Sequence, residues 1–216
     1  MLTSTNQTLA APQPTQTVIV NGTKPPRRQK NAALRKREHL TEAEIKQLRQ
    51  QASHRDSTMI LIAYRHGLRV SELCALEWRD VIDLDHAARA SLQVERLKGS
   101  ISGTHPLEPD EVTALRRLRK ESEPGDVYLF QGRDGDKLSP AGFRKMLSRL
   151  AVAAGLADLH IHPHMLRHTA GQLLVDKMPL GMLADYLGHA QIQNTRIYSR
   201  ANGERFRGIW RQQRHK

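Results

Sequence analysis

From residue 40 onward, apolar positions recur mostly at helical spacing. Thr41 followed by Glu44 forms a capping box, in which each side chain satisfies a backbone N–H that the first turn leaves without a partner. Ile45 and Leu48 then lie one turn apart on the same side. The pattern predicts a first helix here, and we expect the folded part of the chain to begin near Leu40.

The next helix is the most apolar stretch of the chain. Residues 59–64 are apolar on most sides, which is typical of a central, buried helix. We expect this helix to follow Asp56 and Ser57 and to end at Gly67, because glycine readily adopts the left-handed backbone that ends helices. Residues 70–76 predict another short helix.

A small antiparallel sheet is expected between these helices and the later ones. Residues 81–82 and 92–94 have the alternating character of strands. Gly99 and Gly103 indicate a turn, and residues 104–107 return as a third strand.

Proline marks the starts of the later helices, since it fits the first helical turn and its fixed backbone angle favours helix there. These helices are expected to begin at Pro109, Pro140, Pro163 and Pro179, to end near Glu121, Gly155 and Gly188 where an end is indicated, and to precede two segments around Tyr198 and Trp210. The predicted fold class is therefore mainly α with a small antiparallel β-sheet.

Residues 1–38 differ from the rest in composition. They are rich in Thr, Gln, Asn and Pro, which predicts a disordered tail. The whole chain carries a net charge of +12, and residues 1–37 contribute to it because they contain basic residues and no Asp or Glu. The tail is either a solvated leader or an arm that binds DNA phosphates. The residues assigned to such an arm are Lys24, Arg27, Arg28, Lys30, Arg35, Lys36 and Arg37.

The positive charge narrows the class of partner. A pI of about 10.3 favours nucleic acid first and an anionic membrane surface second. No apolar run approaches the ~20 residues that a membrane helix needs, and no secretory signal is evident. Cys74, the single cysteine, excludes an internal disulfide and fits a reducing compartment. A cytoplasmic protein is expected.

Two arginines are candidates for anion binding. Arg167 follows His164 by three residues, so both lie on one helix face, next to apolar positions. A guanidinium there needs an anion, which is either a nearby carboxylate or a phosphate. Arg69 precedes Glu72 by three, which indicates either a local surface ion pair or a carboxylate that holds Arg69 toward a phosphate.

Four histidines crowd around the start of the same helix and raise the question of a metal. They are His160, His162, His164 and His168. No Glu lies within the pair that is four residues apart, and the Cys, Asp or Glu ligands usual for zinc are missing at fixed spacing. We therefore expect neither a metal nor a cofactor.

Three more residues have an ordinary interpretation when taken singly. His189 follows a helix end, Lys98 lies near a hairpin tip, and Tyr198 is one of four tyrosines and by default packs in the core. Together with the two arginines they supply a nucleophile, two phosphate-binding groups and proton donors. This inventory fits metal-free phosphoryl transfer.

In order and spacing these residues resemble the active site of the tyrosine recombinases, the phage-integrase type. The matching motifs are Arg69 in GLRVSEL, Lys98 in LKGS, His164 and Arg167 in HPHMLRH, His189 in LGH and Tyr198 in TRIYSR. The phrases THPL, IHPHMLRH, DYLGH and ERFRGIW are similar to those of fimbrial phase-switch invertases.

The resemblance implies a fold, a reaction and partners. The fold would be the integrase-like catalytic domain at 39–200, after the tail at 1–38 and before a C-terminal segment at 201–216 that docks on a neighbouring protomer. Tyr198 would form a 3′-phosphotyrosyl bond while Arg69, Arg167 and His189 stabilise the transition state. Lys98 would protonate the leaving oxygen, His164 would assist proton transfer, and Glu72 would support the site.

Double-stranded DNA with specific sites would be the partner, bound by a homotetramer on two sites, with accessory proteins that bend the DNA, in a bacterial cytoplasm at the nucleoid. The outcome would be DNA inversion or the integration or excision of a mobile element. We expect the family's separate core-binding domain to have no counterpart in this chain. Two alternatives stay open: a DNA-binding regulator of the same fold without cleavage activity, and a type IB topoisomerase.

Overall fold

The structure is a computed structural model that describes residues 37–96, 102–132 and 135–199. Lys98, the basic residues from Lys24 to Lys36, and the segment 201–216 lie outside the described residues. The expected division into tail, catalytic domain and C-terminal segment stays a prediction.

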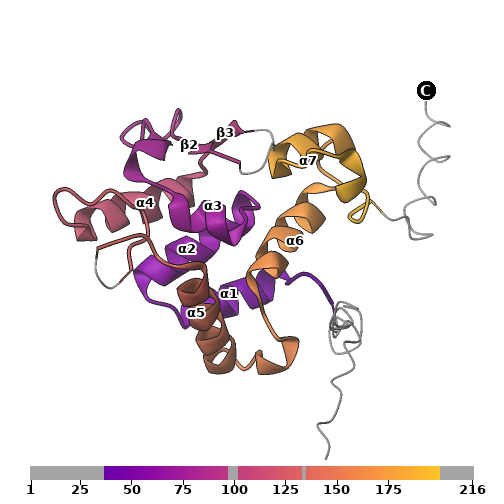
Figure 1. Ribbon diagram of the computed structural model, residues 1–216, viewed down its shortest axis with the longest axis horizontal. Helices are drawn as coiled ribbons and strands as arrows, with labels where there is room; N and C mark the ends of the chain where they lie inside the picture. The colour runs from indigo at the N-terminus through magenta and orange to yellow at the C-terminus, as the bar shows by residue number, and fades with distance from the viewer. Residues whose placement is uncertain (1–36, 97–101, 133–134, 200–216) are drawn as a thin grey trace, which may run out of the picture. The chain divides into compact units, whose positions relative to one another are not determined.

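The described part is mainly helical with one three-stranded antiparallel sheet, which confirms the predicted fold class (Figure 1). The helices are α1 (Glu42–Gln50), α2 (His54–Arg65), α3 (Val70–Ala75), α4 (Pro109–Glu121), α5 (Pro140–Ala153), α6 (Pro163–Leu174) and α7 (Leu180–Leu187). The strands are β1 (Val81–Ile82), β2 (Ser91–Val94) and β3 (Gly103–Pro106), and short 3-10 turns lie at η2 (Trp78–Asp80), η3 (Ala157–Leu159) and η4 (Ile192–Asn194).

Helix α2 is the element on which the others pack. Met59, Ile60, Leu61 and Ile62 are all fully buried, and the helix contacts α1, α3, α4 and α6. It begins earlier than the sequence predicted, because Ser53 caps it by accepting a hydrogen bond from the backbone N–H of Asp56 at 3.2 Å. Asp56 therefore lies inside the first turn, where its charge favours the helix dipole.

Gly67 ends the turn after α2, as predicted, with a φ of 58°. A Cβ at this position would lie 2.4 Å from Cδ2 of Leu187 in α7. Glycine is needed here both for the backbone conformation and for the close approach, since real side chains do not tolerate such a contact. The end of α2 can therefore lie directly against the end of α7.

The sheet has the order β1-β2-β3, and β2 pairs with β3 in a register that sets Leu92 opposite His105 and Val94 opposite Gly103. Gly103 thus belongs to a strand and not to the turn that the sequence indicated. Leu92 and Val94 face the core. Because strand side chains alternate, Arg96 falls on the same inward face.

A small second cluster of apolar side chains lies apart from the main core. It consists of Ala170, Leu183, Leu187 and Tyr198, and it packs α7 and the segment after it onto α6. Tyr198 therefore packs in this small cluster and not in the main core of the domain. Among the described helices, none is both long and apolar enough to cross a membrane.

Candidate active site

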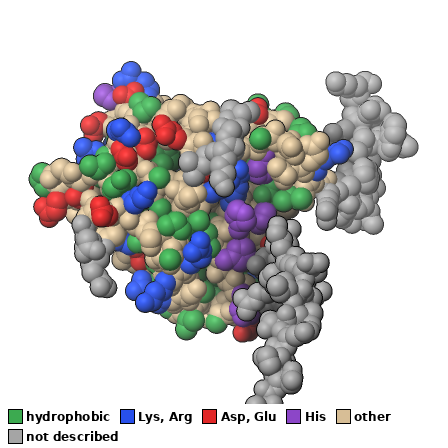
Figure 2. All heavy atoms as spheres, in the orientation of Figure 1, with side chains coloured by type: hydrophobic (Ala, Val, Ile, Leu, Met, Phe, Trp, Pro, Cys, Tyr) green, Lys and Arg blue, Asp and Glu red, His purple; other side chains and the backbone are tan. Residues whose placement is uncertain are grey.

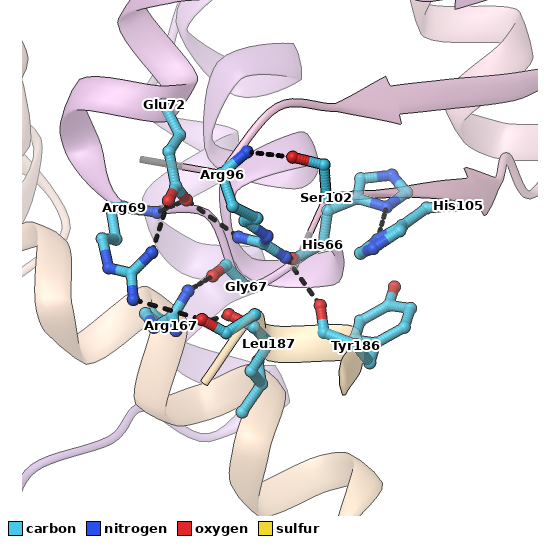
Figure 3. Close-up of polar contacts among 11 residues, drawn as sticks. His66, Gly67, Arg69, Glu72, Arg96, Ser102, His105, Arg167, Tyr186 and Leu187 are labelled. Carbon is cyan, nitrogen blue, oxygen red and sulfur yellow. Dashed lines mark hydrogen bonds and ion pairs between the residues drawn. The ribbon is translucent and has the colours of Figure 1, made fainter. Parts of the chain in front are cut away.

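The candidate site forms where the C-terminal ends of α2 and α7 meet (Figure 3). The last carbonyl groups of a helix have no partner within it. Arginine side chains supply donors to five such carbonyls, which belong to His66, Gly67, Tyr186, Leu187 and Gly188. Three guanidinium groups are thereby gathered in one place by two helix ends.

Arg167 bridges the two helix ends. Its Nη1 donates to the carbonyl oxygen of Gly67 at 2.5 Å and its Nη2 to that of Leu187 at 2.6 Å. The residue is only 4% exposed. Burial, with the nearby charges of Arg69 and Arg96, lowers the pKa of Arg167 to about 10. Of the two anions that the sequence left open, the carboxylate is not the one that binds here: backbone carbonyls hold the guanidinium, so the charge of Arg167 is solvated without being cancelled.

Arg69 combines both interpretations that the sequence left open. Its Nη1 donates to Oε1 of Glu72 at 2.6 Å, and the other carboxylate oxygen accepts from the Arg69 backbone N–H at 2.8 Å. Its Nη2 reaches the carbonyl oxygen of Gly188 at 3.4 Å. The side chain is 30% exposed. Glu72 therefore holds a guanidinium that remains accessible from solvent.

Arg96 is a third guanidinium at the site, and no motif in the sequence pointed to it. Its Nη1 donates to Oε2 of Glu72 at 2.8 Å, and its Nη2 donates to the carbonyls of His66 and Tyr186 at 3.2 and 2.6 Å. Burial alone would raise the pKa of the Glu72 carboxyl, but the Arg69 N–H and the charges of Arg96 and Arg69 outweigh it and hold that pKa below its usual range. The strand alternation that makes Leu92 and Val94 inward could have identified Arg96.

The charges at the site do not balance. Arg69, Arg96 and Arg167 face one carboxylate, that of Glu72, which leaves two formal positive charges. Each helix end offsets this by roughly half a negative charge. A surplus of about one positive charge remains beside the exposed Arg69, and this favours a singly charged anion such as a phosphodiester.

His189 directly follows the end of α7 and is held by Thr195. Its Nδ1 lies 2.8 Å from Oγ1 of Thr195, which is fully buried. Burial first, and then the charges of Arg167 and its neighbours, lower the pKa of His189 to about 4. The imidazole is neutral at pH 7. When the Thr195 hydroxyl donates to Nδ1, the hydrogen of the ring lies on Nε2, which becomes a donor.

Tyr198 lies over α6 and is 6% exposed. A Cβ added to Gly171 would be 2.4 Å from its Cζ, so the ring rests directly on the glycine. Its hydroxyl lies 2.9 Å from Nδ1 of His168. Burial raises the pKa of Tyr198, and Arg167 opposes the rise. Burial first, and then electrostatic repulsion from His164, lowers the pKa of His168, the imidazole that faces the phenol.

His164 does not share the environment of Arg167, although both are on α6. Its side chain is exposed, and its ring meets that of His168 edge-on with centroids 5.6 Å apart. Histidine side chains gather beside basic ones on the face shown in Figure 2. Arg37, assigned to the basic arm, pairs with Glu44 of α1.

A cluster of buried polar side chains next to Arg96 was also not predicted from the sequence. His66 and His105 approach at 3.2 Å between their Nδ1 atoms, and the His105 ring stacks on Tyr186 with centroids 4.1 Å apart. His66 Nε2 lies 3.0 Å from Oε1 of Glu111, although the pair is poorly aligned for a hydrogen bond. Burial, with the charges of His66 and Arg96, lowers the pKa of His105 to about 3.

The chain is similar to known proteins along most of its length. The model of the phage integrase family matches residues 38–205. The type 1 fimbriae regulatory protein FimE of Escherichia coli strain K12 is 35% identical over 187 residues, which cover 81% of this chain and 91% of FimE. The tyrosine recombinase XerC of Xanthomonas axonopodis pv. citri strain 306 is 37% identical over 147 residues, which cover 67% of this chain and 46% of XerC. The crystal structure of the XerA recombinase superposes with a TM-score of 0.67 at 26% identity, covering 82% of this chain and 65% of XerA. The chain thus spans nearly all of FimE but about half of XerC.

Proposed function

The chain belongs to the phage integrase family, and from this membership we propose that it is a site-specific DNA recombinase that cuts and rejoins DNA through a 3′-phosphotyrosyl intermediate. Its substrate is double-stranded DNA. The proposal rests on the convergence of Arg69 and Arg167, which donate to the adjacent carbonyls of Gly188 and Leu187. The site as a whole keeps a surplus of positive charge that a phosphate can neutralise.

The chemistry follows from this arrangement. The phenolic oxygen of Tyr198 attacks the scissile phosphorus, a P–O bond forms to the tyrosine, and the bond to the 5′ oxygen breaks. Arg69, Arg167 and the Nε2 hydrogen of His189 stabilise the added negative charge of the pentacoordinate transition state. The bond energy is retained in the phosphotyrosine, so the freed 5′-hydroxyl of a partner strand reverses the step without ATP.

The remaining roles in the proposal come from the family resemblance. Lys98 protonates the departing 5′ oxygen, His164 assists proton transfer, and Glu72 positions Arg69. Four protomers assemble on two DNA sites, the segment 201–216 docks on a neighbouring protomer, and DNA-bending proteins assist. The resemblance of the chain's motifs to those of fimbrial phase-switch invertases favours inversion of a DNA segment over integration, and we expect the protein to act on the nucleoid in a bacterial cytoplasm.

A nicked duplex tests the proposal against a DNA-binding regulator of the same fold. The nick lets the fragment with the 5′-hydroxyl diffuse away, so a covalent protein–DNA adduct accumulates. Duplexes tiled over any inverted repeats found in the DNA beside the gene serve as substrates. We expect a covalent band on a denaturing gel. Retardation on a native gel without such a band would favour the regulator, and relaxation of a plasmid that lacks the repeats would favour a topoisomerase.

A further inference from the structure

Arg96 is buried at the base of the β2–β3 hairpin, with a side chain that is 1% exposed. Its guanidinium makes three contacts on three different elements: Glu72 in α3, the carbonyl of His66 after α2, and the carbonyl of Tyr186 in α7. Its own backbone N–H donates to Oγ of Ser102 at 2.9 Å across the hairpin. Figure 3 shows these groups around one guanidinium. Such a cation is costly to bury unless all its donors are used, so its position is specific.

We propose that Arg96 is a positioning residue of the recombination reaction, an inference that rests on the proposed function. It acts through Glu72. If Glu72 had Arg69 as its single partner, the two would form a neutral ion pair in front of the phosphate. Because Arg96 binds the second carboxylate oxygen, the group of Arg69, Glu72 and Arg96 keeps one net positive charge. Glu72 therefore holds Arg69 in place, and the Glu72 carboxylate does not neutralise the positive charge that faces the phosphate.

The aliphatic part of Arg96 also supports the end of α7. A Cβ at Gly188 would lie 2.8 Å from both Cγ and Cδ of Arg96, so the arginine stem passes directly beneath this glycine. The Gly188 carbonyl accepts from Arg69, and the next residue is His189. The place of Arg96 thus fixes the backbone that bears His189 and whose Gly188 carbonyl accepts from Arg69.

A positioning role for Arg96 predicts different effects on DNA affinity and on the rate of covalent capture. The side chain of Arg96 is 1% exposed and its guanidinium is held by Glu72 and two backbone carbonyls, so we expect it to act through these groups and not by contacting DNA. Loss of Arg96 should therefore leave DNA affinity within about threefold of wild type. It should lower the rate of covalent capture at saturating DNA by roughly 10- to 100-fold, somewhat less than the ~10²–10³ for a direct oxyanion donor.

The test is a double-mutant cycle on the full chain, using the nicked duplex that wild type captures best. Arg96→Met, Glu72→Gln and the double variant are compared for single-turnover capture rate and for dissociation constant. We expect the double variant to react at least about tenfold faster than Arg96→Met, because the neutral amide that replaces the Glu72 carboxylate no longer cancels the charge of Arg69. Arg116→Met is the matched control, since Arg116 also bonds a carbonyl, that of Leu84, but in α4.

Each outcome decides the inference. A wild-type capture rate in Arg96→Met, or rate losses that simply multiply in the cycle, would overturn the role of Arg96 while the proposed function stands. If wild type captures no tiled duplex, the proposed function fails first. If Arg96→Met does not fold, Arg96→Lys replaces it. Lysine keeps the charge but lacks the fork that reaches both Glu72 and the carbonyls, so a loss of about tenfold is expected. An undiminished rate in that variant overturns the inference.

Discussion

The contact between Tyr198 and Gly171 gives a steric test of where the proposed nucleophile rests. Gly171→Ala adds a methyl group 2.4 Å from Cζ of the ring and 2.6 Å from both Cε atoms. Carbon atoms pack at about 3.5–4.0 Å, so the ring must move by more than ~1 Å. Such a shift breaks the 2.9 Å contact between the hydroxyl and His168.

The expected energy follows from three contributions. Overpacking costs about 1–3 kcal/mol, and the lost hydrogen bond costs about 1 kcal/mol. The better helix propensity of alanine returns up to about 1 kcal/mol. The free energy of unfolding of Gly171→Ala should therefore fall by about 1–3 kcal/mol. Because a misplacement of about 1 Å can cost on the order of 10² in rate, covalent capture should slow by a similar factor.

Urea unfolding and single-turnover capture of the nicked duplex measure the two effects. Gly181→Ala is the control, because Gly181 lies on neighbouring α7 and an added Cβ there meets no atom within 4 Å. That variant should be as stable as wild type or slightly more so, and equally active. If Gly171→Ala behaves like Gly181→Ala in both measurements, the ring of Tyr198 does not pack on Gly171 of α6 and the described position of the ring is wrong.

Three further outcomes are expected. The folded-state pKa of His105, about 3, lies below its unfolded value of ~6.5, so its contribution to stability is complete above about pH 6.5 and is lost as the pH falls; at pH 5 the loss is about 2 kcal/mol. Urea unfolding at pH 7 and pH 5 should show that His105→Gln removes this loss and that His86→Gln, at an exposed position, does not. If the free energy of unfolding falls equally between the two pH values in both variants, His105 is not the source of the loss. Thr195→Val should let the ring of His189 turn and slow capture about tenfold at unchanged DNA affinity, and an unchanged rate would contradict the assigned hydrogen bond. Deleting residues 1–36 should reduce the salt dependence of DNA affinity by up to about five units of log–log slope, and an unchanged slope in a salt titration would show that the tail does not contact phosphate.

Local signals in the sequence were sufficient for most of the fold. The capping box at Thr41, the proline starts of α4, α5 and α6, and the glycine after α7 each depend on neighbouring residues, and each is present in the structure. The start of α2 at Ser53 was not predicted, because Asp56 and Ser57 are equally plausible N-cap residues for that helix.

The site was harder to predict because its partners are distant in sequence. The residues that accept from Arg167 are 100 and 20 positions away, and both are backbone carbonyls, which no residue type announces. The contact between Tyr198 and His168 spans 30 positions and depends on how α7 turns the chain back. Arg96 was in principle visible, because its place in the strand alternation makes an inward charge that requires a partner such as Glu72.

In the proposed reaction, Tyr198 attacks a phosphate held by Arg69 and Arg167. The most direct measurement is peptide mapping, by mass spectrometry, of the adduct trapped on the nicked duplex. We expect one modified peptide, which carries a 3′-phosphate linkage on Tyr198 and is missing from the Tyr198→Phe variant even though that variant still binds the DNA. An adduct on another residue, a linkage to the 5′ end, or an adduct formed by Tyr198→Phe would contradict it.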